Sequence, residues 1–435
     1  MHPNALLEAC TELVRLTLKF DHPADAVVSK FFRDYRKTYA FGPRERATLA
    51  ETTYNVLRNK LRYDHLAPSG SGPKERRLAI LGFADHLQNR HARPSNNPLD
   101  FLFGALNKQE AAWLEACTKV QTSDLLERHR HNLPEWLVEP LKAQVGDGFW
   151  PLVAQLNASA PLDLRVNTFT DKREDVQKEL KAAGIQATPT PFSPWGLRIQ
   201  GKPALSQLDL FARGAVEVQD EGSQLLALLL DAKRGEMVCD FCAGAGGKTL
   251  AIGASMRSTG RLYAFDTSAH RLEALKPRLA RSKLSNVHPA AIAHERDDRI
   301  KRLSGKMDRV LVDAPCSGLG TLRRNPDLKW RQSPQSVAEL TVKQTAILAS
   351  AARMLKSGGR LVYATCSLLP EENEAIAQAF SAAHPEFTPL PVSETLQALK
   401  VTDAASLSSH DGLYLRLWPH LHASDGFFAA TWTAK

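Results

Sequence analysis

The clearest structural signal in this chain is the stretch Met237-Val-Cys-Asp-Phe-Cys-Ala-Gly-Ala-Gly-Gly-Lys-Thr249. Its first part is apolar or β-prone apart from Asp240, and it predicts a short buried strand. The glycines that follow permit positive φ angles and the close approach of a ligand, and helical spacing begins at Thr249. A strand, a glycine turn and a helix in this order predict the start of a doubly wound, mostly parallel, Rossmann-like α/β sheet.

The spacing of this turn predicts its ligand. A phosphate-binding P-loop needs glycine six positions before its lysine, but position 242 is Cys, and the dinucleotide fingerprint needs glycine where Thr249 stands. Asp266 ends the next predicted strand, at the separation from which an acid reaches ribose hydroxyls. S-adenosylmethionine (SAM) therefore fits best, and a turn whose glycines serve only packing is the alternative. The residues of the turn expected to hold SAM are Cys242, Ala243, Gly244, Ala245, Gly246, Gly247 and Lys248.

Size and composition limit the class of the protein. Its 435 residues are too many for one ordinary core, and a hydrophobic content of 43% supports packed domains. The net charge of +9 favours a polyanionic partner. Six cysteines in a chain of this length argue against a disulfide scaffold, and no signal peptide or membrane-spanning run is evident. We expect a reducing, cytoplasmic compartment, no membrane partner and a monomeric chain.

Three domains are predicted along the chain. Helical periodicity, clearest over Leu6–Val14, predicts an all-α domain at residues 1–145. A strand–helix–strand–strand order predicts a small α+β module at 146–225, and regular alternation of strands and helices predicts an α/β domain at 226–435. The strands of the small module are expected at 162–166, 196–199 and 215–218.

The amino-terminal helices carry many cations. One helix is expected over 43–61, and basic residues such as Arg33, Arg44 and Arg58 lie between the apolar positions of this region. A cation-rich helical face is either a solvated face or an RNA-docking surface, and the sequence leaves both readings open.

Two further predicted strands end in cysteine motifs. One reads Leu311-Val-Asp-Ala-Pro-Cys-Ser-Gly318, and the other, after a turn at Gly358-Gly359, reads Leu361-Val-Tyr-Ala-Thr-Cys-Ser367. Parallel strands end at one edge of a sheet, so Asp313, Cys316 and Cys366 are expected beside the glycine turn. Packing cysteines are common, but two at strand ends with an acid nearby favour chemistry. A thiolate costs roughly 2 kcal/mol at pH 7, and Lys248 is the candidate cation that would reduce this cost.

With these motifs the chain resembles the NOL/NOP/Sun family of RNA cytosine-C5 methyltransferases, in its bacterial RsmB-like branch. The resemblance rests on the motifs at 240–249, 313–318 and 365–367 and on the tail Asp425-Gly-Phe-Phe428. The helical front is more loosely similar to the NusB-like RNA-binding domain of that branch. The resemblance implies that the module at 146–225 binds RNA and that 226–435 is the SAM-dependent methyltransferase catalytic domain. The family usually has proline where this chain has Ala245, a change that should loosen the turn without removing an amide that binds SAM.

The resemblance implies a covalent mechanism. Cys366 would attack C6 of a cytosine, which makes C5 nucleophilic enough to accept the methyl group of SAM. Asp313 would border SAM and hold the N3/N4 edge of the base, Lys248 would contact its O2 side, and Cys316 would assist release. The target base must leave its stack, so a loop or an opened strand of RNA is the expected substrate.

Other candidates rest on weaker patterns. The segment 323–331 combines cations with an aromatic ring and is expected either to contact RNA or to form a structured loop over the sheet. A third acid is expected near the adenine at 294–298, where several polar residues compete and Asp297 is preferred. No metal site is expected, because Cys239-x-x-Cys242 has no second ligand pair at zinc spacing. The side chains expected to contact RNA are Arg323, Arg324, Trp330 and Arg331.

The sequence therefore predicts a SAM-dependent RNA cytosine-5 methyltransferase whose partner is RNA, ribosomal RNA in the first place. Three alternatives stay open. They are a tRNA substrate, an RNA-binding ribosome-assembly factor with a structural SAM site, and a P-loop NTPase, against which Cys242 argues.

Overall fold

The computed structural model describes residues 1–38, 41–90 and 97–435, and these form two compact units. The first unit comprises Met1–Ser159 and Leu322–Ser333, and the second comprises Ala160–Thr321 and Pro334–Lys435. A short segment from late in the chain thus belongs to the first unit. The division into three domains at residues 145 and 225 stays a prediction.

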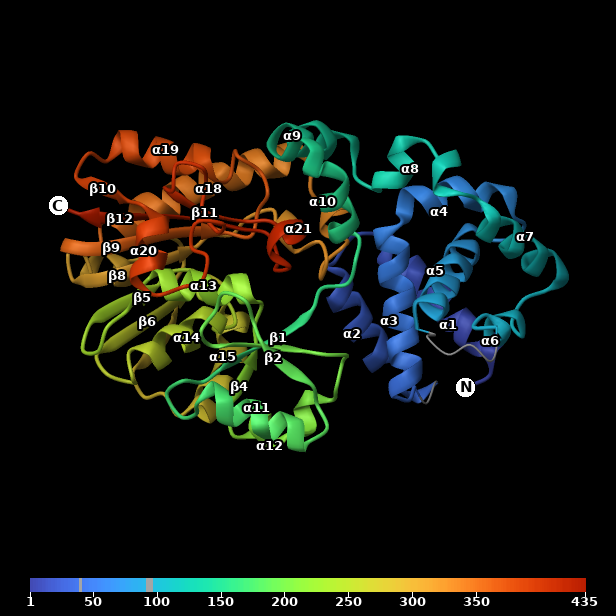
Figure 1. The fold of residues 1–435 in the computed structure, drawn as a ribbon, viewed down its shortest axis with the longest axis horizontal. Coiled ribbons are helices and arrows are strands. Elements are labelled where there is room, and N and C mark those ends of the chain that lie inside the picture. Colours follow the sequence, from blue (N-terminus) through green and yellow to red (C-terminus); the bar gives the residue numbers. More distant parts are fainter. Residues whose placement is uncertain (39–40, 91–96) are drawn as a thin grey trace. The chain divides into compact units, whose positions relative to one another are not determined.

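The first unit is helical, as the periodicity predicts (Figure 1). The apolar positions of Leu6–Val14 are all buried, and they pack with helices α3 and α5 into one core. The helices are α1 (Pro3–Thr17), α2 (Ala24–Asp34), α3 (Pro43–Arg58), α4 (Lys60–Leu66), α5 (Lys74–Arg90), α6 (Asp100–Phe103), α7 (Lys108–Lys119), α8 (Glu127–His131), α9 (Glu135–Val145), α10 (Phe149–Leu156) and α17 (Leu328–Arg331).

The helix expected over 43–61 is interrupted. Helix α3 ends at Arg58 and α4 begins at Lys60, because Asn59 leaves the helical region with φ −106° and ψ 22°. The Arg58 side chain is buried, and its guanidinium donates to the carbonyl of Arg323 at 3.2 Å. Arg58 therefore belongs to neither a solvated face nor an RNA-docking face.

The second unit begins with a small antiparallel sheet. Its four strands are β1 (Leu162–Val166), β2 (Ala187–Pro189), β3 (Gly196–Ile199) and β4 (Val216–Val218), in the order β2-β3-β1-β4. Helix α11 (Arg173–Ala182) packs on the sheet through Val176 and Leu180, and α12 (Asp209–Ala212) precedes β4. The three strands expected from the sequence are all present, and β2 is an addition.

An eight-stranded sheet forms the centre of the second unit, in the order β10-β12-β9-β8-β5-β6-β7 with β11 on β12. The pairs from β9 to β7 are parallel, whereas β10, β11 and β9 are antiparallel to β12. The strands are β5 (Met237–Asp240), β6 (Arg261–Asp266), β7 (Val287–Ala291), β8 (Met307–Asp313), β9 (Leu355–Thr365), β10 (Phe387–Leu390), β11 (Tyr414–Leu417) and β12 (Phe427–Ala434). This is the doubly wound, Rossmann-like sheet that the glycine turn predicts.

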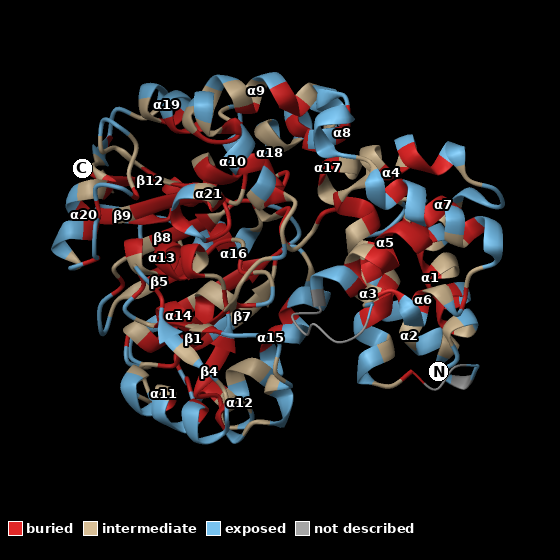
Figure 2. Cartoon of the chain, turned by 45° about the vertical axis from the view of Figure 1, so that its right-hand side comes forward, coloured by how far each residue is buried: buried red, intermediate tan, exposed pale blue. Residues whose placement is uncertain are grey.

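Helices cover both faces of this sheet, and the central strands are buried (Figures 1 and 2). Because side chains alternate along a strand, Val238 packs in the core with α13 and α14, whereas Cys239 packs in the core with α18 and α19. The helices are α13 (Glu221–Leu229), α14 (Gly247–Ser255), α15 (Ala269–Ser282), α16 (Asp298–Arg302), α18 (Pro334–Ala352), α19 (Glu374–Ala383), α20 (Val392–Ala398) and α21 (Pro419–His422).

The expected turn at Gly358-Gly359 lies inside a strand. Strand β9 begins at Leu355, and its pairing with β8 shifts register between Met307 and Arg309. Gly358 has φ 76°, so the two glycines form an irregularity of the kind found in β-bulges. The ladder with β8 omits residues 356–359 and resumes at Arg360, so the chain does turn aside before the paired strand 360–365, although β9 begins earlier than predicted, at Leu355.

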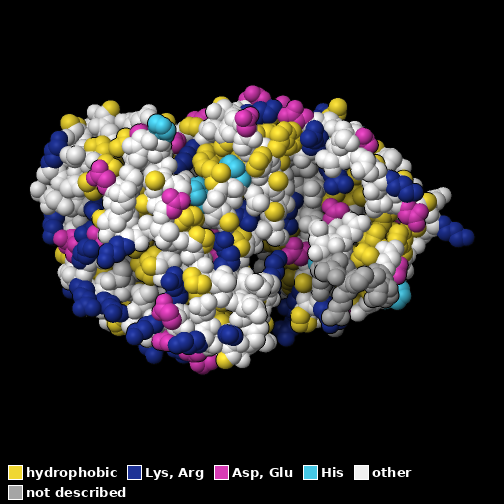
Figure 3. Space-filling model, viewed as in Figure 1, with side chains coloured by type: hydrophobic (Ala, Val, Ile, Leu, Met, Phe, Trp, Pro, Cys, Tyr) yellow, Lys and Arg dark blue, Asp and Glu magenta, His cyan; other side chains and the backbone are white. Residues whose placement is uncertain are grey.

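Lysine and arginine side chains are frequent over the lower left of the face in Figure 3, on the second unit, with acidic side chains among them. The positive net charge of +9 is therefore not confined to the amino-terminal helices. None of the described helices combines the length and apolar character that a bilayer crossing needs.

Candidate active site

The glycine turn between β5 and α14 forms a backbone cradle. The amide of Ala243 donates to the carbonyl of Phe265 at 2.8 Å, and that of Gly246 donates to Ala243 at 2.9 Å. Gly244 and Gly246 have φ angles of 56° and 81°, which side chains disfavour. A Cβ at Gly246 would also lie 2.2 Å from Leu275 Cδ1, so this position has no room for one.

Asp266 braces the turn from the end of β6. One carboxylate oxygen accepts from the amide of Gly244 at 2.8 Å, and the other accepts from the amide of Ser268 at 2.7 Å. The carboxylate is thus held at the edge of the cradle, next to the strand end where a ribose is expected.

Asp240, the last residue of β5, is a buried acid beneath the turn. Its Oδ2 accepts from the Thr249 hydroxyl at 2.6 Å, while Oδ1 has no hydrogen-bond partner among the described residues. Burial is the main reason that the pKa of Asp240 rises to about 7, and the charge of Asp313 adds to it against the Thr249 hydrogen bond. The sequence marked Asp240 only as a strand end and did not predict its pairing with Thr249.

Lys248, in the first turn of α14, reaches the end of β8. Its Nζ donates to Asp313 Oδ2 at 2.7 Å and lies 5.9 Å from the centroid of the Phe427 ring. Burial lowers the pKa of Lys248, but the charge of Asp313 and its hydrogen bond outweigh burial, and Cys366 also contributes. The pKa is therefore raised, and Lys248 is a cation beside both Asp313 and Cys366.

The two cysteines predicted to meet do meet. Cys316 follows β8 and Cys366 follows β9, and their sulfur atoms lie 3.4 Å apart. The hydrogen bond to Cys366 and then burial raise the pKa of Cys316 well above its ordinary value, and the charge of Glu372 adds to the rise. Cys316 is therefore a neutral thiol in contact with the sulfur of Cys366, and either sulfur can be the donor.

Backbone contacts join the cysteine loops to the tail motif. The amide of Gly320 donates to the carbonyl of Cys366 at 2.8 Å, and that of Gly426 donates to Gly320 at 2.9 Å. A Cβ at Gly320 would lie 2.1 Å from the carbonyl oxygen of Gly426, so only glycine permits this approach. Motifs separated by more than a hundred positions thus form one hydrogen-bonded unit.

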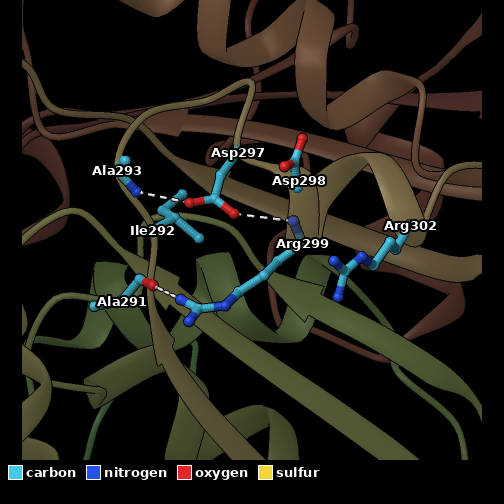
Figure 4. Close-up of a pocket in the computed structure, with 7 residues that line it drawn as sticks. All are labelled: Ala291, Ile292, Ala293, Asp297, Asp298, Arg299 and Arg302. Carbon is cyan, nitrogen blue, oxygen red and sulfur yellow. Dashed lines mark hydrogen bonds between the residues drawn. The ribbon is translucent and has the colours of Figure 1, made fainter.

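A cavity of about 570 Å³ lies beyond the end of β7 (Figure 4). Asp297, the preferred third acid, caps α16 there: its oxygens accept from the amides of Ala293 and Arg299, each at 2.9 Å. Arg299 also donates to the carbonyl of Ala291. The walls from Ala291 to Ala293 are apolar, and they lie at the strand end where the sequence placed the third acid.

The segment expected to contact RNA lies in the first unit, where protein contacts hold it. The Trp330 indole donates to the carbonyl of Leu57 at 2.7 Å, and Asp327 accepts from the amide of Ala24 at 3.1 Å. Arg323 is buried, while Trp330, Arg324 and Arg331 are half-buried. An RNA contact from these four side chains stays a prediction, distinct from the structural role that the contacts assign to the segment.

Comparison with known proteins gives a consistent result. The family model for the 16S rRNA methyltransferase RsmB/F matches residues 227–433, and that for the ferredoxin-like domain of RsmF/B-like methyltransferases matches 133–206. The ribosomal RNA small subunit methyltransferase B of Yersinia enterocolitica is 35% identical over 68% of this chain and 69% of that protein. A probable ribosomal RNA small subunit methyltransferase B of Synechocystis sp. is 37% identical over 69% of this chain and 66% of that protein. Its counterpart in Bacillus subtilis is 28% identical over 92% of this chain and 93% of that protein.

A solved structure is similar over the whole chain. The crystal structure of PH0851 is 27% identical, covers 100% of this chain and 99% of that chain, and superposes with a TM-score of 0.77. The similarity therefore includes the helical unit and both sheets.

Proposed function

Because the chain belongs to the family of the ribosomal RNA small subunit methyltransferase B proteins, we propose that it transfers a methyl group from SAM to C5 of a cytosine in 16S rRNA. The observation that carries the proposal is the 3.4 Å separation of the Cys316 and Cys366 sulfurs beside the Lys248–Asp313 ion pair. One thiol would suffice for packing or for a simple nucleophile. Two adjacent thiols, one of them held neutral, suit a reaction that both forms and breaks a covalent bond to the base.

The residues around the glycine turn fit SAM. The turn leads into the amino end of α14, and Asp266, which accepts from the amide of Gly244, lies at the end of β6, where ribose hydroxyls would bind. The cavity at the end of β7, with a volume of about 570 Å³, has room for an adenine ring and offers it the side chains of Ala291–Ala293 and the carboxylate of Asp297. When bound, SAM supplies an electrophilic methyl group.

Four side chains, those of Cys366, Asp313, Lys248 and Cys316, would take part in the reaction. The Cys366 thiolate would add to C6 of cytosine, and the electron pair of the C5–C6 double bond would move onto C5. C5 would then be nucleophilic enough to take the methyl group of SAM, whose sulfur–methyl bond breaks to leave S-adenosylhomocysteine. Asp313 holds the N3/N4 edge of the base, and Lys248 keeps positive charge beside the reacting groups. Loss of the C5 proton to a base then lets the C6–S bond break, which restores the double bond and frees Cys366. Cys316, a neutral thiol 3.4 Å away, is placed to assist this release.

Two variants test the assignment. Cys316→Ala should accumulate an RNA–protein adduct that survives denaturation, because release is impaired while attack is not. Cys366→Ala should form no adduct and transfer no methyl group. Bisulfite sequencing of rRNA and tRNA from a deletion strain, complemented with each variant, identifies the target. Full methylation by Cys366→Ala would exclude Cys366 as the nucleophile. If the deletion strain loses a methylated site in tRNA alone, tRNA replaces 16S rRNA as the proposed substrate.

A further inference from the structure

The two cysteine loops share one buried carboxylate, that of Glu372. Glu372 lies in the turn between β9 and α19, and its side chain is fully buried. Its Oε2 accepts from the hydroxyl of Ser317 at 2.5 Å and from the hydroxyl of Ser367. These two serines directly follow Cys316 and Cys366 in the chain. A single carboxylate thus contacts both cysteine-bearing loops.

The other carboxylate oxygen is also satisfied. Glu372 Oε1 accepts from the amide of Ser317 at 2.8 Å and from the side-chain amide of Gln344 at 3.0 Å. A buried carboxylate is costly unless donors surround it, and four donors do so here. The hydroxyls of Ser317 and Ser367 lie 3.1 Å apart, so the acid completes a compact polar cluster at the core of the two loops.

The turn that carries Glu372 is itself fixed to β9. The Tyr363 hydroxyl donates to the carbonyl of Glu372 at 2.6 Å, and the Thr365 hydroxyl donates to Asn373 Oδ1 at 2.5 Å. Asn373 in turn donates to the carbonyl of Ser367 at 3.1 Å. The carboxylate therefore has little freedom to move relative to the strand that ends at Cys366.

We propose that Glu372 is a positioning residue that sets the separation of the Cys316 and Cys366 sulfurs. Consecutive Cα atoms are 3.8 Å apart, so fixing Ser317 and Ser367 on one carboxylate leaves the preceding cysteines few alternative placements. The negative charge of Glu372 also helps to keep Cys316 a neutral thiol. The expected effect of Glu372 on catalysis rests on the proposed function. Its effect on the separation of the two sulfurs does not.

The geometric part is tested without RNA. Dilute hydrogen peroxide joins two nearby thiols as a disulfide: each sulfur loses one hydrogen, and peroxide is reduced to water. One thiolate first gives a sulfenic acid, which then loses water to the second thiol. The rate of this closing step, measured by competition with dimedone and peptide mass mapping of the full chain, reports the proximity of the Cys316 and Cys366 sulfurs and is the rate of disulfide formation compared below. Glu372→Gln removes the charge and one acceptor at nearly constant shape, and Glu371→Gln is the matched control because Glu371 is the exposed neighbour. We expect Glu372→Gln to slow disulfide formation about tenfold or more, and Glu371→Gln to leave it unchanged.

The catalytic part is tested on RNA. Glu372→Gln should lower kcat roughly 10- to 100-fold while KM for RNA and for SAM stays near the wild-type value, because the substrate sites are intact. It should also raise the fraction of RNA in the denaturation-stable adduct, as Cys316→Ala does. If Glu372→Gln fails to fold, the double variant Ser317→Ala/Ser367→Ala removes the two hydroxyls and leaves the carboxylate with its amide donors.

The outcomes separate the two proposals. Wild-type disulfide rates in folded Glu372→Gln, or in the double serine variant, would overturn the positioning role even if the chain methylates RNA. If disulfide formation is slow in Glu372→Gln and the wild-type chain methylates no RNA, the positioning role is retained and the proposed function is overturned. A higher KM for RNA or for SAM with an unchanged kcat would assign Glu372 to substrate binding and overturn the proposal.

Discussion

The amino group of Lys248 donates to the carboxylate of Asp313 at 2.7 Å, although 65 positions separate them in the chain. The ion pair joins the glycine turn to the end of β8 at the point where the cysteine loop begins. Because Lys248 also interacts with Cys366, one cation serves both the acid and the proposed nucleophile.

Replacement of Lys248 should therefore slow catalysis more than it changes the fold. We expect Lys248→Met to reduce the single-turnover rate of methyl transfer by about 100-fold or more, because a preorganised charge beside the reacting groups is lost. Lys248→Arg keeps the charge, and its single-turnover rate should lie between those of Lys248→Met and the wild type. Lys276→Met, in an exposed pair with Glu273, is the control. A Lys248→Met rate equal to that of the control would remove Lys248 from the chemistry.

The thiol pair should make the enzyme sensitive to peroxide. Sulfurs 3.4 Å apart need only a small movement to reach bonding distance, so brief oxidation should form the Cys316–Cys366 disulfide before other thiols react. Methyl transfer should be lost in parallel and restored by dithiothreitol. Buried Cys10, whose pKa burial raises to about 12, should stay reduced. Peptide mapping that finds oxidation at Cys10 first would contradict the expected order.

Gly244 and Gly246, the two glycines of the turn with positive φ, provide a matched pair. Alanine at Gly244 meets nothing closer than Arg271 Nη1 at 4.0 Å and suffers only from its positive φ, at a cost of about 1–2 kcal/mol. Alanine at Gly246 also collides with Leu275 and should cost about 1–3 kcal/mol more. Thermal unfolding of Gly244→Ala and Gly246→Ala measures the difference. Equal melting temperatures would mean that Leu275 moves aside without cost.

Asp240 should make stability depend on pH in an identifiable direction. Its pKa rises from an ordinary 3.8 to about 7 in the folded chain. Below 3.8 both states are protonated, whereas between the two values the folded state binds more protons than the unfolded state. Stability from this group is therefore lost as pH rises toward 7 and is constant above it.

Asp240→Asn isolates this effect. The difference in unfolding free energy, variant minus wild type, should increase between pH 4 and pH 8 by up to roughly 4 kcal/mol, because asparagine cannot ionise. Urea unfolding of both proteins across this range gives the difference directly. A difference that does not change with pH would show that Asp240 ionises at its ordinary pKa.

The local patterns anticipated much of the catalytic unit. Buried strands, glycines and cysteine motifs at strand ends predicted that Asp313, Cys316 and Cys366 lie beside the glycine turn, because parallel strands end at one edge of a sheet. Lys248 was a candidate cation whose partner the sequence could not identify. Patterns of this kind could not anticipate Glu372, since an acid near a helix start is ordinary at a helix amino end. Its partners Ser317 and Ser367 reach it only through the pairing of β8 with β9. The break at Asn59 and the burial of Arg58 escaped prediction for the same reason, because both depend on packing with a distant segment.

What the sequence by itself determined is the order of strands and helices, the left-handed positions of the glycine turn and the identity of the reactive groups. These follow from local sterics and periodicity, which act over a few residues. Only the tertiary structure decided the distances: the two sulfurs in contact, one carboxylate bonded to two loops, and a buried acid whose pKa approaches 7. Such features arise where burial and long-range strand pairing bring groups together, and no short stretch of chain contains both partners.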